Sequence, residues 1–254
     1  MLKEKLFINK IAENHPSILF VVGQPRSGKT TYIKNTSFSK YININSDEYR
    51  VFHQQANEIV EKYPTHYAKL TNYDAHLWGD ELFSYAIEHG YSVLREKVPT
   101  DYGLLEMMKI IPSNYEVALH VVLTGNLESL LRTHERYERD LNENKIAKLS
   151  SRDAHNKCYQ LLPDFVKKCL EFNIKVSYVS IEENQWKIQS ILDHSLEVLQ
   201  KEREESNKTA CIQYDIRMHK IKESKKFRNA SQEEWDELEK IEDIYLEIKK
   251  LFML

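Results

Sequence analysis

The chain has 254 residues, of which 30% are charged, and its formal net charge is −3. This length suffices for one large domain, or for one domain with an appendage, around a proper hydrophobic core. The near balance of charge argues against a protein built to hold duplex DNA or RNA through its phosphates, because such proteins usually carry a marked basic excess. We therefore expect no nucleic-acid partner.

The N-terminal region shows no targeting pattern. Residues 1–11 mix lysine and glutamate with apolar residues, and the apolar run at 18–22 is too short for a signal core or a membrane span. The cysteines Cys158, Cys169 and Cys211 form neither a metal-ligand pair nor an even disulfide framework. We expect buried, reduced thiols in a cytoplasmic protein that does not contact membranes.

Five short apolar or β-branched runs are separated by stretches with helical periodicity. The runs cover residues 17–22, 41–45, 91–94, 117–123 and 175–180. Since the intervals are long enough for crossover helices, the pattern predicts an α/β fold with a mostly parallel five-stranded sheet.

A complete phosphate-binding loop follows the first of these runs, and helix-forming residues from Thr30 follow the loop. Glycines let the backbone approach a phosphate closely, and the N-terminus of the next helix adds partial positive charge. In such loops the lysine, here Lys29, reaches the β- and γ-phosphates, and the hydroxyl of Thr30 binds Mg²⁺. We therefore predict a site for ATP or GTP with Mg²⁺, formed by Gly23, Gln24, Pro25, Arg26, Ser27, Gly28, Lys29, Thr30 and Thr31.

The second run ends in Asn45-Ser46-Asp47-Glu48-Tyr49-Arg50. Ligands of open parallel sheets bind outside the carboxyl ends of the strands, so Asp47 is expected near Lys29. A carboxylate there can accept the proton of an attacking hydroxyl and help to position Mg²⁺. Arg50 would face the same cleft if a helix starts at Asp47. The alternative is that Asp47 only caps that helix.

The third strand ends in Glu96, which by the same geometry points to the cleft, toward a magnesium-bound water or a substrate hydroxyl. Asp80 could join it from the preceding helical stretch, although an aspartate in Trp78-Gly79-Asp80-Glu81 is more often a helix cap. Arg136 and Arg152 come after the fourth strand. Guanidinium groups from a lid can stabilise a transferring phosphoryl group, but surface ion pairing is the alternative for each.

The chain changes character after about residue 199. A charged stretch at 201–208 is followed by residues without a strand signal, and Ser231-Gln232-Glu233-Glu234 has the form of a capping box that opens a last helix. We expect a domain at residues 1–200 and a helical extension at 201–254. The apolar stripe of the last helix could pack on the body or on the preceding helix, bind a partner, or fold over the active site as an inhibitor. The apolar stripe consists of Trp235, Leu238, Ile241, Ile244, Tyr245, Ile248 and Leu251.

The basic segment 220–228 is expected to be a solvated helix face.

The ordered motifs resemble the zeta-toxin family of bacterial toxin-antitoxin kinases over roughly residues 15–180. The Gly-Gln-Pro opening of the phosphate loop, the Asn-x-Asp-x-x-Arg motif ending at Arg50, the strand-ending Glu96, Arg136-Tyr137-Glu138 and Arg152 carry the resemblance. It implies a P-loop kinase-like three-layer fold and an enzyme that uses ATP and Mg²⁺ to phosphorylate the sugar 3′-hydroxyl of UDP-N-acetylglucosamine or a related nucleotide sugar. A small helical antitoxin normally occupies the nucleotide site in this family.

The resemblance also implies roles for single residues. Lys29 and Thr30 would hold the triphosphate and magnesium, with Asp47 as general base. Arg136 and Arg152 would contact the transferring phosphate. Arg50, Asp80, Glu96 and Thr100 are the expected substrate-binding residues.

The chain departs from the family pattern after Glu96. Better-known members tend to carry Gly-Thr and a basic residue there, whereas this chain has Lys97-Val98-Pro99-Thr100-Asp101. Two alternatives therefore stay open. One is a kinase of another small molecule, such as a nucleoside, dinucleotide, polyol or antibiotic. The other is a nucleotide-dependent binding protein without transferase activity, which would be indifferent to Asp47→Asn.

Overall fold

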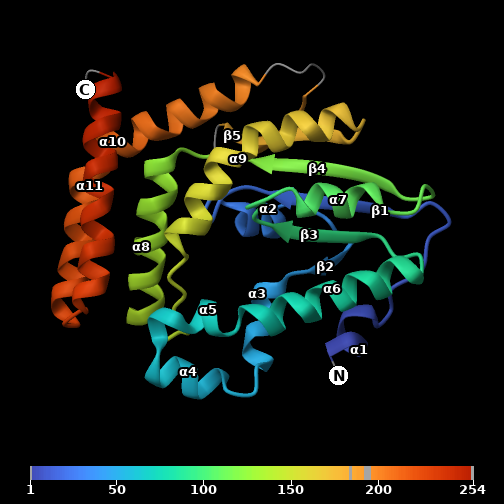
Figure 1. Cartoon of the computed structure of the whole chain (residues 1–254), viewed down its shortest axis with the longest axis horizontal. Coiled ribbons are helices and arrows are strands. Elements are labelled where there is room, and N and C mark those ends of the chain that lie inside the picture. Colours follow the sequence, from blue (N-terminus) through green and yellow to red (C-terminus); the bar gives the residue numbers. More distant parts are fainter. Residues whose placement is uncertain (1, 183–184, 192–195, 253–254) are drawn as a thin grey trace.

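The computed structural model describes residues 2–182, 185–191 and 196–252. Helices pack on both faces of a central sheet, and a pair of long C-terminal helices lies at one end of the molecule (Figure 1). Among the helices of these residues, none has the length and apolar character needed to cross a membrane. The helices are α1 (Leu2–Phe7), α2 (Lys29–Asn35), α3 (Ser46–Tyr49), η1 (Arg50–Phe52), α4 (Ala56–Lys62), η2 (Pro64–His66), α5 (Tyr67–Leu70), α6 (Asn72–Glu88), α7 (Gly103–Lys109), α8 (Asn126–Asn142), α9 (Arg152–Glu171), α10 (Glu197–Phe227) and α11 (Gln232–Phe252).

The sheet has six strands in the order β2-β3-β1-β4-β5-β6. The first five are parallel and occupy the five predicted positions to within a few residues, which confirms the expected α/β class. Every residue of β1 is buried, as a continuous apolar run in a parallel sheet requires. The strands are β1 (Ser17–Val22), β2 (Ile42–Ile44), β3 (Val93–Lys97), β4 (Glu116–Val122), β5 (Lys175–Glu182) and β6 (Gln185–Ser190).

The predicted number of five strands was wrong, because β6 pairs antiparallel with β5. Its sequence alternates polar residues with Trp186 and Ile188, a period of two that marks a strand with two unlike faces. Trp186 packs against Tyr32 of α2, with the ring centroids 5.3 Å apart. A half-polar strand at the sheet edge gives a much weaker signal than the buried apolar runs.

The two faces of the sheet have separate hydrophobic cores, because successive side chains of β1 point in opposite directions. Ile18, Phe20 and Val22 face the larger core, which α6, α7 and α9 cover. Leu19 and Val21 face a smaller core with α2. The three-layer arrangement follows from this alternation.

The C-terminal helices bury their apolar stripes against α8. A third cluster joins residues of α8, α10 and α11, and Tyr214 stacks on Tyr245 with ring centroids 3.7 Å apart. Packing on the body and on the preceding helix, one of the expected alternatives, is therefore what the structure shows. The predicted capping box is confirmed, since Ser231 N donates to Glu234 Oε2 at 3.0 Å and Glu234 N donates to Ser231 Oγ at 3.4 Å. Leu251 is the exception in the stripe and is 77% exposed.

The segment 220–228 is not wholly the solvated face that we expected. Lys225 is fully buried, with its ammonium 3.0 Å from Glu138 of α8 and 3.6 Å from Glu234 of α11. Arg228 bonds the same two carboxylates. Buried charges must be paired, so this basic segment holds three helices together.

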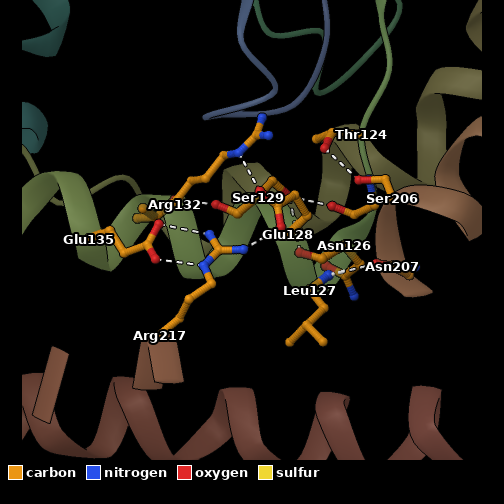
Figure 2. Close-up of polar contacts among 12 residues, drawn as sticks. Thr124, Asn126, Leu127, Glu128, Ser129, Arg132, Glu135, Ser206, Asn207 and Arg217 are labelled. Carbon is orange, nitrogen blue, oxygen red and sulfur yellow. Dashed lines mark hydrogen bonds and ion pairs between the residues drawn. The ribbon is translucent and has the colours of Figure 1, made fainter. Parts of the chain in front are cut away.

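Helix α10 also supplies the N-terminal cap of α8 (Figure 2). Gly125, at the N-cap position of α8, has no capping side chain. Instead Ser206 Oγ accepts a hydrogen bond from Gly125 N at 2.8 Å, and Asn207 Oδ1 accepts one from Leu127 N at 3.1 Å. A Cβ at Gly125 would lie 2.1 Å from Asn207 Oδ1, so only glycine permits this approach.

The cap is connected to the phosphate loop. Thr124 Oγ1 lies 2.9 Å from Ser206 Oγ, while its carbonyl accepts a hydrogen bond from Gln24 Nε2 at 2.8 Å. Arg217 of α10 adds a bidentate pair with Glu135 of α8, at 2.6 and 2.7 Å (Figure 2). The boundary predicted between residues 200 and 201 falls inside α10, in the helix that makes these contacts.

Candidate functional site

One large cleft, with a volume of about 1640 Å³, lies at the carboxyl edge of the parallel strands. The phosphate loop follows β1, α3 follows β2, and Glu96 is near the end of β3, so all three reach the same edge. The predicted site residues that line the cleft are Pro25, Arg26, Gly28, Lys29, Thr30, Thr31, Asp47, Arg50, Glu96, Thr100, Arg136 and Arg152.

The Lys29 side chain is folded into its own loop. Its ammonium donates to the carbonyl oxygens of Gly23 and Gln24, at 2.9 Å each, and lies 4.0 Å from Glu96 Oε1. Burial lowers the pKa of Lys29, and the charge of Glu96 opposes that shift. The ammonium is thus buried among loop carbonyl oxygens and beside the Glu96 carboxylate.

The loop backbone has the form that a bound phosphate requires. Gly28 has φ +106°, and a Cβ at Gly23 would lie 2.5 Å from the carbonyl oxygen of Val122. Ser27 Oγ and Gln24 Oε1 are buried, and neither has a hydrogen-bond partner within the described residues. A buried hydroxyl without a partner beside a glycine-lined cradle fits a phosphate oxygen as its partner.

Thr30 and Glu96 meet beside Lys29. The Thr30 hydroxyl lies 2.9 Å and 3.2 Å from the two carboxylate oxygens of Glu96, whose side chain is 17% exposed. A hydroxyl and a carboxylate are the hard oxygen donors that Mg²⁺ prefers. The residues present therefore fit a magnesium ion at Thr30. The sequence placed Glu96 only at the same edge of the sheet, whereas the structure brings its carboxylate into hydrogen-bond contact with the Thr30 hydroxyl.

Asp47 does not cap α3, because Asn45 does: Asn45 Oδ1 accepts a hydrogen bond from Asp47 N at 3.1 Å. The Asp47 carboxylate is instead held by cations, with Lys148 Nζ at 2.6 and 2.7 Å and Arg50 Nε at 2.8 Å. Burial alone would raise the pKa of Asp47, but Lys148 and Arg50 outweigh it and hold that pKa well below its usual value. The carboxylate is therefore ionised and directed toward the cleft.

Arg50 is 4% exposed and nearly all of its guanidinium is engaged. Besides Asp47, it donates to the carbonyl oxygen of Ala68 at 2.7 Å, to Thr71 Oγ1 at 3.1 Å and to Asn72 Oδ1 at 3.0 Å. These bonds tie the start of η1 to α5 and α6. The structure therefore gives Arg50 the position of a support behind Asp47, and its predicted contact with a substrate stays a prediction.

Asp80 lies inside α6, so the helix-cap interpretation of this residue was wrong. Its carboxylate is 2.7 Å from Arg95 Nη2 and 3.6 Å from Lys97 Nζ. Arg95 is fully buried in β3, and its guanidinium also lies over the Phe83 ring, 4.5 Å from the centroid. Sequence reasoning missed Arg95, whose neighbours Asp80 and Phe83 come from the preceding helix α6.

The two predicted lid arginines differ in their surroundings. Arg136 of α8 has a 46% exposed side chain, paired only loosely with Asp140 at 3.2 Å. Arg152, the first residue of α9, is paired with Glu237 of α11 at 3.1 Å. Both line the cleft, so each arginine is ion-paired without being removed from the site, and only the Arg136 pair lies at the surface. A catalytic role for each stays a prediction.

Lys148 is the site residue that sequence reasoning missed. It lies between α8 and α9 in a segment with two lysines and no motif, and only the folded chain brings it to Asp47. The sequence could have suggested that the Asp47 carboxylate has a cationic partner, but it could not show which lysine is that partner.

The comparison with known proteins decides the family. The family model described as Zeta toxin matches residues 3–210 of this chain. The chain belongs to the zeta-toxin family. Its curated relatives include the proteins called Toxin zeta from Streptococcus agalactiae, 25% identical over 166 residues, and from Streptococcus pyogenes, 25% identical over 167 residues. Each alignment covers 63% of this chain and 58% of the relative.

Solved structures share the fold of this chain. A chain from the PezAT chromosomal toxin-antitoxin system of Streptococcus pneumoniae superposes with a TM-score of 0.71 at 20% identity, covering 87% of this chain and 93% of that one. The AvrRxo1-ORF1:-ORF2 structure with ATP gives a TM-score of 0.54 at 8% identity, covering 79% and 67%. The family match ends inside α10, so it includes the residues that cap α8.

Proposed function

We propose that this protein is an ATP- and Mg²⁺-dependent kinase that phosphorylates a sugar hydroxyl of UDP-N-acetylglucosamine or a related nucleotide sugar, as the toxin of a toxin-antitoxin system. The observation that carries the proposal is that Lys29, Asp47 and Glu96 line one cleft in a member of the zeta-toxin family. A phosphate cradle and an ionised carboxylate in one cleft suit the transfer of phosphate to an alcohol.

Each residue has a physical task in this proposal. The ammonium of Lys29 leaves the loop carbonyls for the β- and γ-phosphates, and the amides of the loop hold the phosphate oxygens. Thr30 and Glu96 would hold the magnesium ion, which when bound would supply Lewis-acid stabilisation of phosphate charge. Arg136 adds a cation beside the transferring group.

Asp47 acts as the general base. It accepts the proton of the acceptor hydroxyl while the acceptor oxygen forms the bond to the terminal phosphorus. The bridging P–O bond breaks and its electron pair leaves with the nucleoside diphosphate. Arg50 keeps the carboxylate ionised and directed to the cleft through the 2.8 Å bond from its Nε.

The partner and the compartment are part of the same proposal. The PezAT structure describes a toxin-antitoxin system, and we propose that a small helical antitoxin binds over the nucleotide site of this protein as well. The free, buried cysteines suit a reducing compartment, and we propose the cytoplasm.

Mass spectrometry of the purified protein with ATP, Mg²⁺ and a panel of UDP-sugars tests the proposal. We expect a mass gain of one phosphate on UDP-N-acetylglucosamine or a related sugar, and no gain with Asp47→Asn. If the protein binds nucleotide but forms no product from any UDP-sugar, the proposed nucleotide-sugar kinase activity is ruled out.

A second candidate function is a kinase of another small molecule. It is favoured by Lys97 and Thr100, which stand where better-known family members carry different residues, and which line the cleft. Extending the panel to nucleosides, dinucleotides and polyols separates the two. Product from one of these alone would favour the second candidate.

A further inference from the structure

Lys148 connects the two parts of the candidate active site through a single residue. Its ammonium bonds both carboxylate oxygens of Asp47, at 2.6 and 2.7 Å. Its carbonyl oxygen accepts a hydrogen bond from Nη2 of Arg26, in the phosphate loop, at 3.2 Å. The segment at 145–151 therefore bridges the cleft between the base and the phosphate cradle.

Of the two cations on Asp47, only Lys148 is replaceable. Arg50 is 4% exposed and is fastened by its bonds to Ala68, Thr71 and Asn72. The Lys148 side chain is 26% exposed, and its ammonium sits at the end of four rotatable methylenes, bonded to Asp47. A ligand that needs Asp47 can displace Lys148 but cannot displace Arg50.

The Lys148 ammonium occupies a position on Asp47 for which an acceptor hydroxyl competes. A general base receives a proton only from a donor within hydrogen-bond distance, about 2.6–3.2 Å between heavy atoms. Arg50 bonds one oxygen of Asp47 and Lys148 bonds both, while the Asp47 side chain as a whole is 53% exposed. An acceptor hydroxyl that bonds Asp47 therefore competes with the Lys148 ammonium for the carboxylate lone pairs.

We propose that Lys148 is a latch on Asp47: the acceptor hydroxyl displaces its ammonium, and the backbone bond to Arg26 keeps the displaced ammonium beside the phosphate loop, next to the transferring phosphoryl group. The inference rests on the proposed function, since it takes Asp47 as the base. It assigns Lys148 two opposite effects, competition with the acceptor before transfer and stabilisation of phosphoryl charge during it.

The two effects predict a split between KM and kcat in Lys148→Met. Loss of the competing ammonium lowers the acceptor KM, and its equilibrium Kd measured without nucleotide, by about threefold to tenfold. Loss of the cation beside the transferring group lowers kcat by about tenfold or more. Lys148→Arg keeps a cation and is expected to retain most of kcat. A merely structural residue would instead raise KM and lower thermal stability.

The experiment uses the full chain with ATP, Mg²⁺ and UDP-N-acetylglucosamine, and Lys145→Met as the matched control. Lys145 belongs to the same segment, but its side chain is 64% exposed and pairs with Glu143 outside the cleft. The control should match the wild type in KM, Kd and kcat within about twofold. A Lys148→Met variant with unchanged Kd for the acceptor, or with a raised KM, overturns the latch.

A second measurement keeps the inference apart from the identity of the acceptor. Hydrogen exchange of the Lys145 amide, which donates to the carbonyl oxygen of Asp140 at 2.8 Å, should accelerate in Lys148→Met and in Asp47→Ala, but not in Lys145→Met, because each of the first two removes the side-chain bond between the segment and Asp47. If wild-type protein phosphorylates no UDP-sugar, the proposed acceptor is wrong while faster exchange still supports the bond between segment and base. Unchanged exchange in both variants overturns the latch whatever the acceptor is.

Discussion

Arg152 and Glu237 form an ion pair at 3.1 Å between the first residue of α9 and the C-terminal helix α11. Both side chains are largely buried, with exposed fractions of 18% and 29%, and both line the cleft. The extension thus reaches the residue that the family resemblance assigns to the transferring phosphate. The pair makes the role of Arg152 testable.

We expect Arg152→Met and Glu237→Gln each to lower the free energy of unfolding by about 1 kcal/mol, because each breaks a partly buried pair. The double variant should recover about half of the summed loss. Urea denaturation measures all three. If Arg152 contacts the phosphate, Arg152→Met lowers kcat by at least about tenfold, whereas Glu237→Gln, which frees the arginine, does not. Equal turnover in the two single variants would leave Arg152 with a structural role alone.

Lys29→Ala and Asp47→Asn should both abolish growth arrest on expression, but by different routes. Without the Lys29 ammonium the phosphates lose a cation, so nucleotide affinity falls. Asp47→Asn should bind nucleotide within about threefold of the wild type and lose about 10²–10⁴ in kcat, since only the proton acceptor is missing. Binding of a fluorescent nucleotide and product formation separate these outcomes.

Glu48→Gln, one residue from Asp47, is the matched control. Full turnover in Asp47→Asn would show that Asp47 is not the base.

His134 should make the protein sensitive to mild acid. Burial, with the nearby Lys225 and Arg152, lowers the pKa of His134 to about 4. The folded protein then binds fewer protons than the unfolded chain between about pH 4 and 6.5, so stability is lost as the pH falls through that window. Between about pH 7 and 5 this one group accounts for about 2 kcal/mol of lost stability.

His134→Gln should lose correspondingly less stability over the same pH range, as followed by urea denaturation at each pH. His219→Gln is the control, because His219 is exposed on α10. A pH dependence in His134→Gln equal to that of the wild type would contradict the burial of a neutral histidine.

Asn207→Ala should destabilise the α/β body although the substitution lies in the C-terminal extension. The variant removes the oxygen that caps Leu127 N and leaves a buried N–H without a partner, at a cost of about 1–2 kcal/mol. Thermal unfolding measures the loss. Gln213→Ala, at an exposed position of the same helix, should change the melting temperature little. A melting temperature unaffected by Asn207→Ala would mean that α8 is capped in another way.

A related question is whether residues 201–254 form a separate unit. The phosphate loop reaches α10 through Gln24, Thr124 and Ser206. Because this path is made of short hydrogen bonds, we expect the extension and the body to unfold together. The division at residue 200 stays a prediction that a single cooperative transition would argue against.

The sequence by itself determined the parallel core of the sheet, the phosphate loop and the places of Asp47 and Glu96. These depend on local information: a buried strand is a continuous apolar run, a phosphate loop has its own glycine spacing, and residues that follow parallel strands meet at one edge. The capping box at Ser231 and Glu234 is local in the same sense.

Only the tertiary structure decided which charged and polar groups meet. Lys148 reaches Asp47 across 101 residues, Lys225 reaches Glu138 across 87, and Ser206 reaches Gly125 across 81. No spacing in the sequence marks such pairs, because a lysine in a loop or a serine in a helix has the same local pattern whether it is solvated or buried against a distant partner. Burial of polar groups forces them to be paired, but the fold chooses the partner.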